Sequence, residues 1–327
     1  MEAIWGLQTE QSLPEYDRLD VSSTSEILSM MNEADQTVPI AVKKALPAVE
    51  EAVELIVKAL SSGGRLFYIG AGTSGRLGVL DAAECPPTFG TPMSLVQGLI
   101  AGGQGAMFKA VEEAEDKWTS ASEDLTAVGL CERDVVVGIS ASGRTPYVVG
   151  GLTYARSVGS ATIALSCNTG ASIGRLADVS IEIDTGPEVL AGSTRLKAGT
   201  AEKLVLNMLS TASMVRLGKA YRNLMVDLKV TNEKLQDRAR RIVMTAAAVD
   251  YDAAERALRL ADGHVKTAIV MARRAIDKAA AEAMLNRANG FLRVALEEDV
   301  FAEAGLVQHR PAAETAAEST AARNGGN

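Results

Sequence analysis

The chain has 327 residues, of which 47% are apolar and 23% are charged, a composition typical of a soluble globular enzyme. Its net charge of −8 argues against a partner bound through a phosphate backbone, so nucleic acid is not expected. The sequence has no basic-then-apolar leader pattern and no apolar run of about 20 residues, so we expect a cytoplasmic protein without a membrane partner.

Histidine and cysteine are too scarce to support several common kinds of site. The two histidines, His264 and His309, lie in the last quarter of the chain, which excludes a Ser-His-Asp hydrolase and leaves acid–base chemistry to carboxylates, lysines or tyrosines. The three cysteines show no CxxC spacing, so neither a zinc site nor a disulfide framework is predicted.

The first segment, residues 1–60, is predicted to be helical from residue 23 onward. Ser23 and Glu26 fit a capping box, and apolar residues follow near helical spacing as far as Leu60. We expect a break or kink at Pro47, because proline lacks the N–H group that a helix interior needs.

Residues 61–230 alternate between strand and helix patterns. The alternation predicts an α/β fold with right-handed crossovers, in which helices cover both faces of a doubly wound parallel sheet. The first helix is expected to end before Pro86-Pro87. The predicted strands are 65–70, 93–100, 134–139, 161–166 and 179–183, and the predicted helices are 76–84, 104–115, 146–158 and 193–217.

Residues 231–305 are rich in alanine and are predicted to form a small helical domain. The tail at 306–327 has no large apolar residue from 310 onward, so we expect it to be disordered. The helices predicted in this part are 234–249, 252–261, 265–272 and 275–296.

Two glycine-containing loops each follow a predicted strand and begin a predicted helix. The first, Gly70-Ala-Gly-Thr-Ser-Gly75, matches the dinucleotide pattern GxGxxG, but no acidic residue lies between Glu84 and Glu112 to hold a ribose, which disfavours a nicotinamide cofactor. The second is Ser140-Ala-Ser-Gly-Arg-Thr-Pro146. Either loop alone fits an N-cap and a tight turn. The two together favour phosphate binding, because helix N-termini attract anions and open parallel sheets bind ligands at this edge.

Both loops resemble the sugar isomerase (SIS) domain, in which serine and threonine side chains hold a sugar phosphate. Longer strings, among them 70–92, 141–149 and 186–204, are similar to the N-acetylmuramic acid 6-phosphate etherases, and the similarity extends from about residue 9 to residue 296. The resemblance implies that phosphate is bound by Thr73, Ser74, Ser140, Ser142 and Thr145. From their positions in or near the predicted crevice, Gly72, Gly143, Glu188 and Lys197 are candidate substrate contacts, and Lys197 fits a structural helix start equally well.

The same resemblance implies a homodimer, a C-terminal three-helix region similar to ubiquitin-associated domains, and no metal or organic cofactor. It also implies cleavage of the D-lactyl ether of N-acetylmuramic acid 6-phosphate to N-acetylglucosamine 6-phosphate and D-lactate, in the recovery of cell-wall amino sugars. Two other functions stay open. One is an SIS-type sugar-phosphate isomerase, and the other is a non-catalytic sugar-phosphate sensor that resembles the glucokinase regulatory protein.

Elimination of lactate followed by addition of water needs one group to remove the C2 proton and one to protonate the departing oxygen. The resemblance assigns these roles to Glu84 and Glu115. We expect Glu84 to be the acid, because it is predicted to end its helix, where the negative end of the dipole raises a carboxyl pKa. Glu115 is then the base at C2, and the opposite assignment stays open.

This chain departs from the usual sequence of the family at several positions. Glu113 and Arg222 replace usual glycines, and Glu202 replaces a usual glutamine. Near the N-terminus, Thr9-Glu-Gln-Ser-Leu-Pro14 differs from the usual Thr-Glu-x-Arg-Asn-Pro. We expect these changes to affect efficiency and substrate range more than reaction class, because both glutamates and both loops are present.

Overall fold

The computed structural model describes residues 6–109, 111, 113–229 and 233–297, and the predicted tail at 306–327 lies outside these residues. The chain divides into two compact units. One consists of Met1–Ala220 with Met225–Leu235, and the other of Tyr221–Leu224 with Gln236–Asn327. The domain boundaries expected at residues 60, 230 and 305 stay predictions.

The first unit contains a five-stranded parallel sheet in the order β2-β1-β3-β4-β5. The central strands β1 and β3 are buried along their whole length, as their nearly continuous apolar sequences predict. The parallel, doubly wound arrangement is therefore confirmed. The strands are β1 (Leu66–Gly70), β2 (Val96–Ile100), β3 (Val135–Ser140), β4 (Ala161–Ser166) and β5 (Val179–Glu182).

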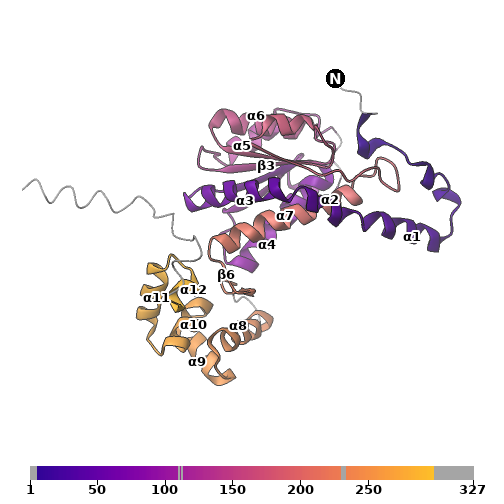
Figure 1. Cartoon of the computed structure of the whole chain (residues 1–327). Helices are drawn as coiled ribbons and strands as arrows, with labels where there is room; N and C mark the ends of the chain where they lie inside the picture. The colour runs from indigo at the N-terminus through magenta and orange to yellow at the C-terminus, as the bar shows by residue number, and fades with distance from the viewer. Residues whose placement is uncertain (1–5, 110, 112, 230–232, 298–327) are drawn as a thin grey trace, which may run out of the picture. The chain divides into compact units, whose positions relative to one another are not determined.

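Helices cover both faces of this sheet (Figure 1). One face carries α3, α4 and α7, and the other carries α5 and α6. Strand β1 lies between β2 and β3 in the sheet. The chain first adds β2 on one side of β1 and then adds β3, β4 and β5 on the other side, so the direction of winding reverses between β1 and β3. The helices are α3 (Leu46–Ser61), α4 (Gly72–Phe89), α5 (Ser120–Ala127), α6 (Pro146–Val158) and α7 (Lys197–Arg216).

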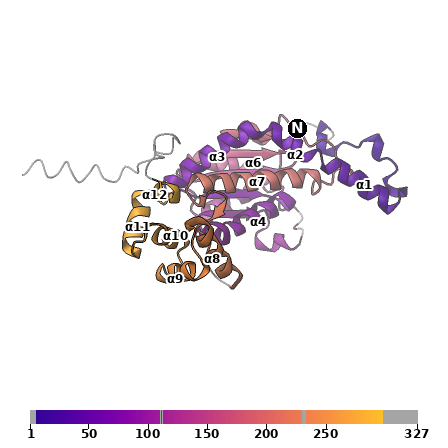
Figure 2. The ribbon, with the colours of Figure 1, turned by 60° about the horizontal axis from the view of Figure 1, so that its bottom comes forward.

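The N-terminal segment holds α1 (Thr24–Asp35) and α2 (Val38–Lys44), and α2 packs beside α7 (Figure 2). The predicted capping box is confirmed: the Ser23 N–H donates to Glu26 Oε2 at 2.8 Å, and the Glu26 N–H donates to Ser23 Oγ at 3.3 Å. The expected break falls at Ala45, which leaves Pro47 in the first turn of α3, where a missing N–H costs nothing.

The predicted end of the helix at 84 is wrong, because α4 continues through Pro86 and Pro87 as far as Phe89. Cys85 and Phe89 are buried in the core beneath the sheet, and their packing holds the last turn helical against the cost of the prolines. Gly90 then ends the helix in the left-handed conformation.

The helix predicted at 104–115 is also wrong. Among the described residues of this segment, the one helical element is a 3-10 turn, η5 (Gln104–Met107). Gly102 and Gly103 before it adopt positive φ, and Ala106 is the one buried residue of the turn. The helix α5 follows instead. It was not predicted, because its sequence is polar and it buries only Ala121 and Leu125.

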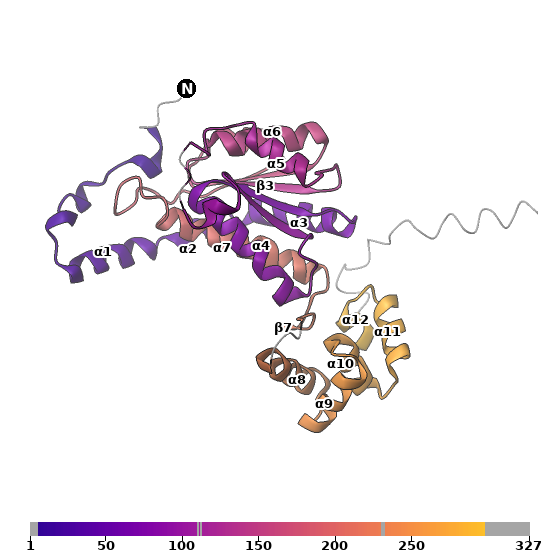
Figure 3. The same cartoon turned by 180° about the vertical axis from the view of Figure 1, so that it is seen from behind.

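The second unit is helical (Figure 3). The single helix predicted at 275–296 is wrong, because α11 begins after its N-cap Asp277 and ends at Arg287. Asn289 and Gly290, which both have positive φ, separate it from α12. The similarity to ubiquitin-associated domains stays a prediction. The helices are α8 (Glu233–Ala247), α9 (Tyr251–Leu260), α10 (Val265–Arg274), α11 (Lys278–Arg287) and α12 (Leu292–Leu296).

All three cysteines are free thiols. Within the part of the chain that the structure describes, no helix has the length and apolar character of a transmembrane span.

Candidate active site

The first glycine-containing loop connects β1 to α4. An added Cβ on Gly75 would lie 2.5 Å from the Gly70 carbonyl oxygen, so only glycine lets the helix start this close to the strand. The N-cap residue Ala71 provides no side-chain acceptor. Among the described residues, the N–H groups of Gly72, Thr73 and Ser74 therefore have no hydrogen-bond partner, which is the arrangement that binds an anion at a helix N-terminus.

The second loop connects β3 to α6 and is organised by the buried hydroxyl of Ser140. Ser140 Oγ lies 2.8 Å from Thr145 Oγ1 and 3.3 Å from Ser142 Oγ, and it accepts the Gly143 N–H at 3.1 Å. Ser140 is 2% exposed, whereas Ser142 and Thr145 are half-buried. Ser140 therefore positions the loop, and Ser142 and Thr145 are better placed to reach a ligand.

The sheet brings the two loops together. Gly70 pairs with Ile139 in the parallel register of β1 and β3. Adjacent strands lie about 4.8 Å apart, so the two loops start side by side at the carboxyl ends of these strands. Two helix N-termini and several hydroxyl groups thus meet where the winding of the sheet reverses.

Glu115 lies close to both loops. It lines a cavity of about 230 Å³ together with Gly72 and Arg76, and its carbonyl oxygen accepts the N–H of Tyr147, at the start of α6, at 3.0 Å. Arg76 donates from Nε to the Met107 carbonyl oxygen at 3.2 Å, which places a cation in the same cavity. We did not select Arg76 from the sequence, although both loops contain Ser-Gly-Arg.

Within one chain, Glu84 lies far from the cavity that Glu115 and Arg76 line. It is exposed on α4, twelve residues after Gly72, which corresponds to about 18 Å along the helix axis. Because α4 runs on to Phe89, the helix-end argument for Glu84 as the acid is also lost.

Glu188 and Lys197 lie at the N-terminus of α7, and Glu188 stabilises that end of the helix. The Glu188 carboxylate is buried and accepts the N–H groups of Lys197 and Ala198, each at 3.0 Å, so it caps the first turn of α7. Burial raises the pKa of Glu188, while these two hydrogen bonds and the Lys197 charge oppose the rise. Neither residue lines the cavity beside Glu115.

Ser74 is buried, and its hydroxyl is engaged with α7. Ser74 Oγ donates to Glu202 Oε1 at 2.7 Å, and the Glu202 side chain is fully buried. Burial raises the pKa of Glu202 to about 8, although the hydrogen bond from Ser74 acts in the opposite direction. This contact joins residues 128 positions apart, so sequence patterns give no sign of it.

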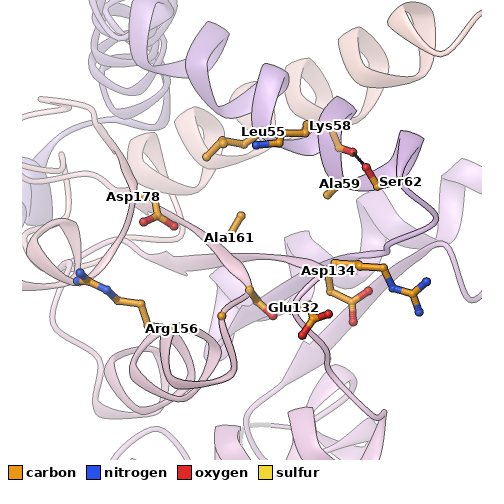
Figure 4. Close-up of a pocket in the computed structure, with 12 residues that line it drawn as sticks. Leu55, Lys58, Ala59, Ser62, Glu132, Asp134, Arg156, Ala161 and Asp178 are labelled. Carbon is orange, nitrogen blue, oxygen red and sulfur yellow. Dashed lines mark hydrogen bonds between the residues drawn. The ribbon is translucent and has the colours of Figure 1, made fainter. Parts of the chain in front are cut away.

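A second, larger concavity of about 520 Å³ lies at the opposite edge of the sheet, where β3, β4 and β5 begin (Figure 4). Its buried carboxylate Asp134 accepts the Arg65 N–H at 2.8 Å and pairs with the Arg65 guanidinium. Its Asp178 accepts both the N–H and the hydroxyl of Thr162. These acidic groups fix the starts of strands, and neither glycine-containing loop contributes to the concavity.

Family models describe the sheet and its loops. A model for the glucokinase regulatory protein N-terminal SIS domain matches residues 48–156, and a model for the SIS domain matches residues 119–212. A phosphoheptose isomerase from Francisella tularensis, at 16% identity, aligns with 59% of this chain and 100% of its own, with a TM-score of 0.47. The two family models and the doubly wound parallel sheet together give this chain the fold of the SIS class.

Two curated relatives narrow this class. The N-acetylmuramic acid 6-phosphate etherase of a Geobacillus species is 57% identical over 263 residues, which cover 80% of this chain and 89% of the relative. That of Mycolicibacterium smegmatis is 58% identical over 263 residues, which cover 80% and 88%. This chain belongs to the N-acetylmuramic acid 6-phosphate etherase family.

Proposed function

We propose that the protein cleaves the D-lactyl ether of N-acetylmuramic acid 6-phosphate to give N-acetylglucosamine 6-phosphate and D-lactate. The observation that carries this proposal is the meeting of two anion-binding helix N-termini with Glu115 beside the cavity, in a chain of this family. The reaction belongs to the recovery of cell-wall amino sugars, which we place in the cytoplasm.

The 6-phosphate binds at the two loops, where the free N–H groups of the first and the hydroxyls of Ser142 and Thr145 donate to its oxygens. In the open-chain sugar, the C1 aldehyde acidifies the C2 proton. Glu115 removes this proton, lactate leaves from C3 with a proton supplied by Glu84, and water then adds at C3. Arg76 provides a positive charge in the cavity for the oxygens of the substrate.

A second copy of the chain supplies Glu84. The separation of about 18 Å along α4 exceeds the span from the phosphate to C3 of a hexose, so one chain does not bring Glu84 to the substrate. The surface also suits a homodimer. Of the twelve residues of α1 only Ala34 is buried, and Leu28, Met93 and Phe108 are exposed apolar side chains that a partner would cover.

The decisive experiment is incubation of the protein with N-acetylmuramic acid 6-phosphate, followed by an assay for D-lactate. The wild type should release lactate, and both Glu84→Gln and Glu115→Gln should reduce the rate by at least a hundredfold. In deuterated water, Glu84→Gln should still exchange the C2 proton and Glu115→Gln should not. Equal exchange in both variants would refute the assignment of base and acid.

The same assay separates the two rival functions. An SIS-type isomerase converts aldose to ketose and releases no lactate, and a sugar-phosphate sensor binds its ligand without turnover. The family membership favours the etherase over both.

A further inference from the structure

Glu202 is a buried carboxyl that the proposed reaction does not use. It lies in the second turn of α7, and its Oε1 is 2.7 Å from Ser74 Oγ in the first turn of α4. Its other oxygen, Oε2, is buried with no hydrogen-bond partner among the described residues. A carboxylate in such a place is costly when charged, because neither water nor a full set of donors stabilises it.

The charged and titratable groups around Glu202 do not include a cation that pairs with it. The face of α3 that packs toward α7 is apolar. Burial and the charge of Glu202 raise the pKa of the Cys167 thiol, which therefore stays neutral. None of the other titratable groups on α7, α4 and α2 forms a hydrogen bond or ion pair with Glu202 among the described residues. These groups are Lys197, Lys203 and Arg216 on α7 with Glu188 at its start, Arg76, Asp81, Glu84 and Cys85 on α4, and Lys43 and Lys44 on α2.

The protonation state of Glu202 decides which way the hydrogen bond to Ser74 runs. When the carboxyl is neutral it can donate its own proton to Ser74 Oγ, which frees the serine proton for an anion at the loop. When the carboxyl is ionised it must accept from Ser74, and a negative charge then lies directly behind the phosphate loop. Both consequences of ionisation weaken the binding of a phosphate dianion.

We propose that Glu202 is a positioning residue that couples sugar-phosphate binding at the two loops to the uptake of one proton. The site holds the 6-phosphate only while the Glu202 carboxyl is neutral, and it releases the sugar phosphate as the solution becomes alkaline. This inference rests on the phosphate site of the proposed function and adds a pH response to it.

The test is calorimetric titration of the full-length protein with N-acetylglucosamine 6-phosphate at pH 7, 8 and 9. Above pH 7 the phosphate is a dianion throughout, because its second pKa is about 6. With a carboxyl that titrates at about 8, the affinity of the wild type should fall about tenfold from pH 7 to pH 9. At pH 8, titrations in two buffers with different heats of ionisation should show uptake of about half a proton.

The isosteric variant Glu202→Gln should bind with less than a twofold change over the same range and take up no proton. Asp81→Asn is the matched control, since it removes another buried carboxyl between α4 and α7 whose partners are Tyr68, Asn207 and Ser210. It should keep the wild-type pH response.

Binding without proton uptake by the wild type, or an unchanged pH response in Glu202→Gln, would overturn the inference and leave the etherase proposal intact. No binding by the wild type at any pH would contradict the phosphate site itself, and this inference with it.

Discussion

Ser140 shows how one buried hydroxyl can organise a ligand loop. It contacts the hydroxyls of Ser142 and Thr145 and accepts the Gly143 N–H, so its removal should disorder several groups of the proposed phosphate site. Ser140→Ala should raise KM for N-acetylmuramic acid 6-phosphate at least tenfold and lower kcat less, because Ser140 does not touch the reacting carbons.

Steady-state rates of lactate release measure this effect. Ser157→Ala is the control, because Ser157 is exposed near the end of α6 and donates to the carbonyl oxygen of Tyr154, its own helix neighbour. The control should stay within twofold of wild type, and an unchanged KM in Ser140→Ala would argue against phosphate binding at this loop.

Glu202 should also make the stability of the fold depend on pH. Its pKa of about 8 in the folded protein exceeds the 4.5 of an exposed glutamate, so the folded chain keeps a proton that the unfolded chain releases. This stabilising contribution is complete below pH 4.5 and is lost as the pH rises to about 8. Between pH 5.5 and pH 7.5 the loss is on the order of 2 kcal/mol.

Urea denaturation of wild type and Glu202→Gln at those two pH values checks this prediction. The free energy of unfolding should fall with pH more steeply in the wild type than in the variant. Parallel pH dependences in the two proteins would show that Glu202 is already ionised in the folded state.

At the scale of elements, the backbone explains why glycine is usual in the family at two positions where this chain has another residue. Glu113 and Arg222 have φ values of 64° and 53°, in the left-handed region that favours glycine. Glu113→Gly and Arg222→Gly should therefore each stabilise the protein by about 1 kcal/mol.

The control for this pair is Glu123→Gly, which places glycine in the right-handed helix α5 and should destabilise by about 1 kcal/mol. Chemical denaturation gives all three values. A loss of stability in both Glu113→Gly and Arg222→Gly would contradict the argument from backbone conformation.

Strands β1, β3 and β4 could be predicted from the sequence because each is a short, mainly apolar run bounded by turns, and α6 was predicted with its observed ends. The end of α4 could not be predicted, because the burial of Cys85 and Phe89 that holds it depends on the assembled sheet. The two loops were found from local patterns. The burial of Ser74 against Glu202 was missed, because it arises from packing between α4 and α7.

For the whole molecule, the central claim is that Glu115 beside the loops of one chain works with Glu84 from a second. Neither glutamate is buried, and about 18 Å of helix separates Glu84 from the first loop of its own chain. In a dimer formed from one Glu84→Gln chain and one Glu115→Gln chain, one site carries both substitutions and the other carries none.

The most direct measurement is therefore lactate release after the two inactive variants have been mixed, unfolded and refolded together. Random pairing makes half of the dimers mixed, each with one intact site, so the mixture should recover about a quarter of the activity of wild type treated in the same way. A mixture as inactive as the separate variants, while refolded wild type releases lactate, would contradict the shared site.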